Sequence, residues 1–287
     1  MSKTVIGILG GSGLYEIQGL KNIRSKKIAT PFGAPSDAYT LGTLNGVTLV
    51  FLPRHGKGHR LNPSEINYRA NIYGMKMLGV EYLLSMSAVG SMKEEIPPRD
   101  VVIVDQFIDR TKGIRPATFF EKGLVAHLGF SEPVCSNLAQ VAYASTKKIT
   151  LKVHPKGTYV CIEGPQFSTR AESHLYRSWN VDVIGMTNLP EAKLAREAEI
   201  CYATIAFSTD YDCWKEDEEA VTAHNVLEVI QSNVETAKKI IQEVAKNIPK
   251  TRKCTCKDAL KYAFVTEFAK VSKQTKNNLK HIIGRYV

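Results

Sequence analysis

Short apolar runs recur along the chain, and polar loops rich in glycine, serine, threonine or proline follow them. Each run has the length and the bordering turn residues of a buried β-strand. These predicted strands lie at residues 4–9, 47–52, 82–87, 100–105, 158–162, 181–186 and 200–207.

Other segments repeat their apolar residues at helical spacing. Residues 67–78 and 222–247 show this pattern, and Pro190 suits the first turn of a helix over residues 190–199. Strands that alternate with helices are typical of a sheet covered by helices. We therefore predict an α/β fold: a single domain in which a central mixed β-sheet is flanked by helices.

The positive charge of the chain is concentrated near its C-terminus. The formal net charge is +10, of which residues 250–287 contribute +8, so residues 1–249 are nearly neutral at +2. We predict a main domain over residues 1–249 and a basic helical C-terminal extension over residues 250–287. The nearly neutral main domain is typical of a small-molecule enzyme, and nucleic acid is not an expected partner.

No apolar run approaches the roughly 20 residues that a membrane-spanning helix needs. The N-terminal residues lead directly into a predicted strand, which is unlike a signal peptide. The sequence therefore predicts a cytoplasmic protein without a membrane partner.

The six cysteines fall into two groups. Cys135, Cys161 and Cys201 lie in apolar surroundings typical of core residues. Cys254 and Cys256 lie in a polar, basic segment, where packing does not explain them. Zinc would need two more ligands, and no further pair of cysteines or histidines has suitable spacing, so no metal site is predicted. A disulfide between Cys254 and Cys256 remains open.

Two carboxylates, Asp210 and Asp212, follow the predicted strand 200–207. If the strand geometry continues, both side chains point to the same face. Ligands of open α/β sheets bind at the carboxyl ends of strands, and paired carboxylates raise each other's affinity for a proton. The pair is therefore a candidate site for sharing or holding a proton, and the alternative is an acidic surface loop.

Groups that suit phosphate follow other predicted strands. Ser12 lies in a glycine-rich loop, although this loop matches neither a Walker A motif nor a dinucleotide fingerprint. An arginine and a histidine end the second strand, and hydroxyl or N–H donors end two others. Together these residues predict a phosphate pocket made of Ser12, Arg54, His55, Ser87, Ala88 and Thr187.

Several longer motifs occur in order between about residues 4 and 247. They are Gly10-Gly11-Ser12-Gly13-Leu14, Thr30-Pro31-Phe32-Gly33-x-Pro35-Ser36-Asp37, Arg54-His55-Gly56, Asn67-Tyr68-x-Ala70-Asn71-Ile72, Asp105-Gln106-Phe107-Ile108-Asp109-Arg110-Thr111, Glu163-Gly164-Pro165-x-Phe167-Ser168-x-Arg170-Ala171-Glu172, Met186-Thr187-x-x-Pro190-Glu191 and Thr209-Asp210-Tyr211-Asp212-Cys213-Trp214. This set resembles the 5′-methylthioadenosine phosphorylases of the trimeric purine nucleoside phosphorylase family. The tail beyond residue 250 extends past the pattern of that family.

The resemblance implies a pentosyltransferase that cleaves the N-glycosidic bond of a 5′-substituted adenosine with inorganic phosphate. Phosphate is then a co-substrate, and no cofactor is expected. Asp210 would protonate N7 of the leaving adenine, and Asp212 would accept a hydrogen bond from the 6-amino group. The 6-oxopurine branch of the family carries an asparagine-type donor in place of Asp210, so Asp210 favours adenine.

The resemblance also implies roles for residues with weaker signals of their own. Phe167 and Ser168 would lie at the purine, Met186 under the ribose, and Ala223 and Val226 beside the 5′ group. His127 would reach the 5′ pocket of a neighbouring subunit in a homotrimer or a dimer of trimers. The alternatives are a 6-oxopurine phosphorylase, a hydrolytic nucleosidase and a non-catalytic polyanion binder that uses the basic tail.

Overall fold

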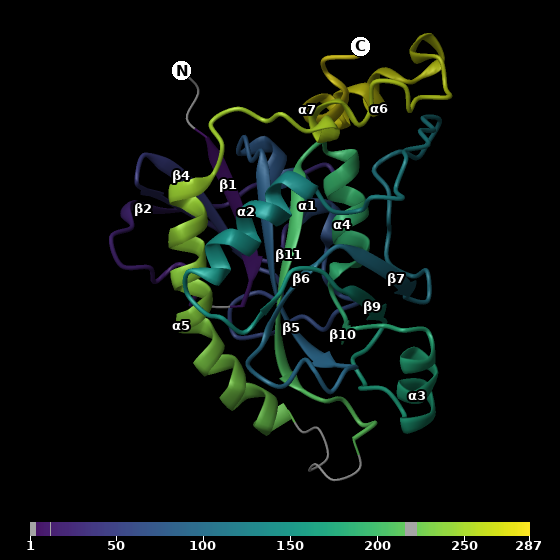
Figure 1. The fold of residues 1–287 in the computed structure, drawn as a ribbon. Helices are drawn as coiled ribbons and strands as arrows, with labels where there is room; N and C mark the ends of the chain where they lie inside the picture. Colours follow the sequence, from purple (N-terminus) through teal and green to yellow (C-terminus); the bar gives the residue numbers. More distant parts are fainter. Residues whose placement is uncertain (1–3, 12, 216–222) are drawn as a thin grey trace.

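The computed structural model describes residues 4–11, 13–215 and 223–287, apart from the side chains at 223–228 and 230–232. Within these residues, eleven strands join in one mixed sheet (Figure 1). The strands are β1 (Val5–Gly10), β2 (Lys21–Lys26), β3 (Tyr39–Leu44), β4 (Val47–Pro53), β5 (Tyr82–Ser91), β6 (Val101–Val104), β7 (Gln106–Arg110), β8 (Val153–His154), β9 (Thr158–Ile162), β10 (Val183–Gly185) and β11 (Cys201–Asp210).

The sheet forks at β5. On one edge of β5, β11 pairs in parallel along residues 82–90. On the other edge, β1 pairs in parallel with residues 82–85, and β10 pairs antiparallel with Gly90 and Ser91. Between these two partners, residues 86–89 have no strand partner on that edge in the described part of the chain. The fork therefore leaves a gap in strand pairing at residues 86–89 of β5, which we call the opening.

Helices cover both faces of the sheet (Figure 1). One hydrophobic cluster packs α1 (Tyr68–Met77) and α4 (Asn188–Glu197) against the sheet, and a second packs α2 (Ser136–Lys147) and α5 (Ala223–Asn247) against the other face. A smaller cluster buries Tyr176 of α3 (Arg170–Ser178) with Tyr211 and Trp214. This arrangement confirms the predicted α/β fold with a central mixed sheet.

The C-terminal segment 250–287 packs onto the same core as α1 and α4. It contains four short helical elements, η1 (Thr255–Asp258), η2 (Phe268–Lys270), α6 (Lys273–Asn278) and α7 (Lys280–Ile283). Leu260, Ile282 and Ile283 are buried in the cluster that also contains residues of α1. The division of the chain at residue 249 stays a prediction.

Glu199, which is buried and follows α4, holds this segment in place. Its carboxylate oxygen Oε1 accepts hydrogen bonds from the Leu260 N–H at 3.1 Å, from Arg285 at 2.7 Å and from the Tyr286 hydroxyl at 2.6 Å. Its carbonyl accepts another from Arg252 at 2.7 Å. One buried acid therefore joins both ends of the basic segment to the core. No helix among the described residues is long and apolar enough to cross a membrane.

Candidate active site

Asp210 and Asp212 lie together at the fork of the sheet. β11 ends at Asp210, after an irregularity between Ser208 and Asp210, and Asp212 has a left-handed backbone with φ of 53°. The strand geometry therefore does not continue, and strand alternation does not explain their placement. Both instead flank Gly90 of β5, where an added Cβ would lie 3.0 Å from Asp210 Oδ1 and 3.4 Å from Asp212 Cβ.

The turn after β11 fixes the Asp210 carboxylate. Its Oδ2 accepts a hydrogen bond from the Thr209 hydroxyl at 2.6 Å, and its Oδ1 accepts one from the Asp212 N–H at 2.8 Å. Asp212 is buried, and burial raises the pKa of its carboxyl above the ordinary value. Two hydrogen-bond donors thus hold the Asp210 carboxylate, whereas the surroundings of Asp212 favour the protonated form of its carboxyl.

Ser87 and Ala88 line the opening on β5. Ser87 is buried, with its hydroxyl 3.5 Å from the Tyr159 hydroxyl, whereas Ala88 is exposed although it lies in a central strand. Ala88 pairs with Phe207 of β11 on one edge, but its other edge has no strand partner among the described residues. Its exposure shows that packing does not cover this point of the sheet, so a ligand can reach it.

Arg54 follows β4 and is buried beneath this opening. Its guanidinium contacts Glu191 of α4 at 2.7 and 3.1 Å and the Ser85 hydroxyl at 2.6 Å. Burial disfavours the charge of Arg54, but Glu191 holds its pKa above the ordinary value. Glu191 belongs to a quoted motif, yet sequence reasoning gave it no role.

His55 presents a neutral ring. Burial lowers the pKa of His55 to about 4. Its Nδ1 lies 2.8 Å from the Leu61 carbonyl, which can only accept, so Nδ1 carries the proton. In the neutral ring Nε2 is then a hydrogen-bond acceptor. The ring also stacks on His59 at 4.1 Å between centroids.

Thr187 lies directly before α4, and its side chain makes no capping hydrogen bond to that helix. The next residue, Asn188, donates to the same Ser85 hydroxyl that Arg54 contacts, at 2.9 Å. Ser85 thus links the start of α4 to Arg54. The structure brings Arg54, Ser87 and Thr187 to one region around the middle of β5.

Arg115, which the sequence analysis missed, ties the loops around this region together. It is buried, and its Nε contacts Glu163 Oε1 at 2.8 Å while Nη1 donates to the Met186 carbonyl at 2.6 Å. Burial opposes the charge of Glu163, but hydrogen bonds from Ser64 and the Lys112 N–H, together with Arg115, hold its pKa below the ordinary value. Nothing in the local sequence around Arg115 distinguishes it from a surface arginine.

Met186 packs its side chain against Gly164, where an added Cβ would lie 2.5 Å from the Met186 sulfur. Gly164 has a φ of 67°, so both its backbone and its close neighbour require glycine. Phe167, in the loop after β9, is 48% exposed, and the Ser168 carbonyl accepts a hydrogen bond from the Cys213 thiol at 3.3 Å. The loop is thereby joined to the turn that carries Asp210 and Asp212.

Three of the predicted side chains lie outside the described part of the structure, and a fourth, His127, lies away from this group. Ser12 lies outside the described residues, and so do the side chains of Ala223 and Val226. His127 is exposed and lies against the C-terminal segment, where its N–H donates to the Ala263 carbonyl at 2.8 Å.

The cysteines depart from the sequence expectation. Cys135 and Cys201 lie beside Cys254 and Cys256, and all four sulfurs fall within 4.8 Å of one another as free thiols. The search for a further pair of ligands at suitable spacing overlooked Cys135 and Cys201, which the fold places beside Cys254 and Cys256. The spacing argument failed because the two additional thiols come singly from distant parts of the sequence.

Comparisons with known proteins agree with this architecture. The model of the phosphorylase superfamily matches residues 5–246. The S-methyl-5′-thioadenosine phosphorylase of Geobacter sulfurreducens is 57% identical over 283 residues, which is 99% of each chain. That coverage includes most of residues 250–287, so the tail does not lie outside the pattern of this relative.

Solved structures show the same likeness. The crystal structure of a methylthioadenosine phosphorylase from an Antarctic soil metagenomic library has a TM-score of 0.93 and 50% identity, covering 98% of this chain and 99% of that one. The methylthioadenosine phosphorylase of Schistosoma mansoni in complex with adenine has a TM-score of 0.83 and 38% identity, covering 90% and 96%. The family match and this identity over the full length lead to one conclusion: the chain belongs to the phosphorylase superfamily.

Proposed function

We propose that this protein cleaves the N-glycosidic bond of 5′-methylthioadenosine with inorganic phosphate, giving adenine and 5-methylthioribose 1-phosphate. The observation that carries the proposal is the pair Asp210 and Asp212 at the open fork of the sheet. Relatives that share more than half of their residues with this chain are S-methyl-5′-thioadenosine phosphorylases, which supports the choice of substrate.

In the proposed reaction a phosphate oxygen forms a bond to C1′ while the bond from C1′ to N9 of the purine breaks. The electron pair of that bond goes to the purine, and a proton on N7 neutralises it. Asp210 delivers this proton, and Asp212 accepts a hydrogen bond from the 6-amino group. Because the sugar becomes cationic on the way, phosphate held on the opposite face also stabilises the transition state.

The phosphate would be held by Ser12, Arg54, His55, Ser87, Ala88 and Thr187. Arg54 supplies positive charge, and the hydroxyl groups of Ser87 and Thr187 supply hydrogen bonds. His55 has a different role, because its Nε2 accepts rather than donates in the neutral ring. It can therefore bind the P–OH group of a protonated phosphate and orient the remaining oxygens toward C1′.

The rest of the pocket follows from the same proposal. Phe167 lies on the purine, Ser168 near its edge, and Met186 under the ribose, while Ala223 and Val226 border the methylthio group. We further propose that the protein is cytoplasmic and forms a homotrimer or a dimer of trimers. In that assembly the exposed His127 completes the 5′ pocket of a neighbouring subunit.

The direct test incubates the protein with 5′-methylthioadenosine, with and without inorganic phosphate, and follows adenine and the sugar product. The proposal expects adenine only when phosphate is present, together with a sugar 1-phosphate. Equal release of adenine without phosphate would indicate a hydrolase. Turnover of inosine in place of methylthioadenosine would indicate a 6-oxopurine phosphorylase and would contradict the role of Asp210.

A further inference from the structure

Four cysteine thiols from three separate parts of the chain meet at the end of the sheet opposite Asp210. Cys135 precedes α2, Cys201 begins β11, and Cys254 and Cys256 flank the start of η1. Their sulfurs all lie within 4.8 Å of one another, and those of Cys201 and Cys254 are 3.2 Å apart. Three of the four residues are buried, and Cys254 is half-buried. Such a cluster has the composition of a site for a thiophilic metal ion.

The backbone holds each cysteine in place independently of the thiols. The N–H of Cys135 donates to the Tyr202 carbonyl at 2.8 Å, next to Cys201. On the other side, Arg252 and Leu260 both donate to Glu199, two residues before Cys201. The turn that carries Cys254 and Cys256 is thus fixed at both ends to the segment that begins β11. The fold brings the thiols together without a bond between them.

The spacing fits one tetrahedral ion. A zinc–sulfur bond of about 2.3 Å places the sulfurs of a tetrahedral site roughly 3.8 Å apart. The Cys201–Cys254 sulfur distance of 3.2 Å and the upper limit of 4.8 Å for the cluster bracket this value, so small side-chain rotations suffice. Four protein sulfurs fill every position of a tetrahedral ion, which is the arrangement of structural rather than catalytic zinc.

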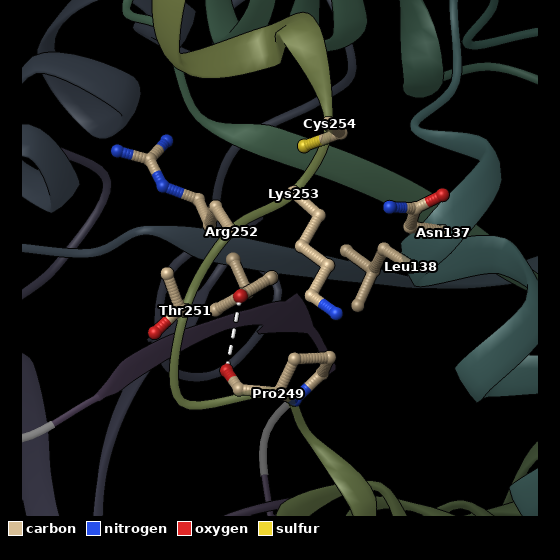
Figure 2. A pocket seen from close by; sticks show the side chains of 8 residues that line it. Asn137, Leu138, Pro249, Thr251, Arg252, Lys253 and Cys254 are labelled. Atoms are coloured by element: carbon tan, nitrogen blue, oxygen red, sulfur yellow. Dashed lines mark hydrogen bonds between the residues drawn. The ribbon is translucent and has the colours of Figure 1, made fainter.

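The surroundings suit the charge of such a site. A zinc ion with four thiolates carries two negative charges, and the cysteine turn itself carries Arg252, Lys253 and Lys257. Cys135 stands at the N-terminus of a twelve-residue helix, whose dipole favours a thiolate. Figure 2 shows Cys254 at the edge of a pocket of about 190 Å³ that Arg252, Lys253, Asn137 and Leu138 also line. Cys254 is thus the member of the cluster that borders this pocket.

We propose that Cys135, Cys201, Cys254 and Cys256 bind one Zn²⁺ ion as a structural site that fastens the C-terminal segment to the core. Binding releases the thiol protons and leaves the oxidation state of every sulfur unchanged. The site does not take part in phosphorolysis, because Cys201 and Asp210 lie at opposite ends of β11, roughly 30 Å apart for an extended strand.

The test measures metal on the full-length protein, expressed in zinc-supplemented medium and purified with a reducing agent and without chelators. Elemental analysis should find about one zinc per chain. Cys254→Ser, at the half-buried position, should lose most of this zinc. Cys161→Ser is the matched control, because it removes a buried thiol that lies outside the cluster. Retention of zinc by Cys254→Ser, or its loss from Cys161→Ser alone, would overturn the assignment.

A second measurement does not depend on how the variants fold. After replacement of zinc by Co²⁺, the wild-type protein should show the near-ultraviolet absorption of thiolate-to-cobalt charge transfer. X-ray absorption of the zinc form should give a zinc–sulfur distance near 2.3 Å. The proposal fails if wild-type protein given excess zinc and then desalted contains none. It also fails if the mass of the denatured, unreduced chain shows that these cysteines are oxidised to disulfides.

Discussion

Arg54 and Glu191 form a buried, two-pronged ion pair that joins the end of β4 to α4, with contacts of 2.7 and 3.1 Å. Neither side chain has appreciable contact with water. The pair therefore holds the guanidinium in one orientation, beside Ser85 and Met86 of β5. Arg54 is thus fixed in a position that depends on Glu191, which supports the phosphate-binding role proposed for it.

The first prediction removes the negative partner. Glu191→Gln leaves a buried arginine without its compensating charge, which costs about 3–5 kcal/mol of unfolding free energy. Urea denaturation followed by circular dichroism measures this loss. Glu235→Gln is the control, because Glu235 lies on the surface beside Lys238. A change in Glu191→Gln as small as that in the control would contradict the structural role of the pair.

The second prediction concerns proton transfer. Asp210→Asn keeps the size of the side chain but cannot deliver a proton to the purine, so kcat should fall by about 10²- to 10⁴-fold. Steady-state release of adenine from methylthioadenosine measures the effect. Asp258→Asn, in the C-terminal segment, should retain wild-type rates. Near-normal turnover by Asp210→Asn would remove this residue from the mechanism.

The third prediction uses Gly90 to displace Asp210 without changing its chemistry. A Cβ at position 90 would lie 3.0 Å from Asp210 Oδ1 and 3.0 Å from Ile184, so Gly90→Ala should shift the carboxylate. We expect a decrease of about 10- to 100-fold in kcat/KM with a small change in melting temperature. Gly129→Ala is the control, because its Cβ would meet no neighbour within 4 Å. Equal rates for the two variants would show that Asp210 tolerates the displacement.

The fourth prediction is a pH dependence of stability. The unfolded state protonates His55 near pH 6.5, whereas the folded state does so only near pH 4. Between these values only the unfolded state takes up the proton, so stability is lost as the pH falls, by about 2 kcal/mol from pH 7 to pH 5. His55→Asn keeps a donor for the Leu61 carbonyl but does not titrate.

Urea denaturation of the wild-type protein and of His55→Asn in phosphate-free buffer separates the titration of His55 from that of the other groups. The difference in unfolding free energy between wild type and His55→Asn should shrink as the pH falls from 7 to 5. A constant difference would mean that the folded protein accepts a proton on His55 as readily as the unfolded chain does.

The fifth prediction tests whether subunits share sites. If His127 completes a neighbouring pocket, a mixed assembly of His127→Ala and Asp210→Asn chains contains some sites with both residues intact. Co-expression of the two chains with different tags, followed by sequential affinity purification, isolates these hybrids. Their activity should exceed that of either parent, and activity at or below the mean of the parents would place His127 outside the shared site.

The sequence predicts the fold well where burial dictates the pattern. Strands β1, β4, β5, β6, β9, β10 and β11 were recognised because they are apolar and lie in the interior. β2 was missed because all of its residues are exposed, and α3 because it buries only Ser173 and Tyr176. Helix α2 was missed for a related reason, since two of its four buried residues are Ser145 and Thr146.

Long-range partners of the site could not be read from the sequence in the same way. Arg54 carried a local signal, but its partner Glu191 is 137 residues away. Arg115 stands in no motif, and its importance follows only from the carbonyls and carboxylate that surround it. The cysteine cluster could not be predicted for the same reason. Spacing in the sequence points to pairs of ligands, whereas Cys135 and Cys201 come as single residues from distant parts of the chain.

The forked sheet also has a consequence for the chain as it is synthesised. β5 is central in the finished sheet, yet its longest partner is β11, whose first residue Cys201 pairs with Tyr82 far earlier in the chain. A nascent chain that has not reached β11 therefore carries an apolar strand with an open edge, and such edges promote aggregation. Ribosomal pausing or premature termination before residue 201 would leave this largely buried strand with an unpaired edge exposed to other chains.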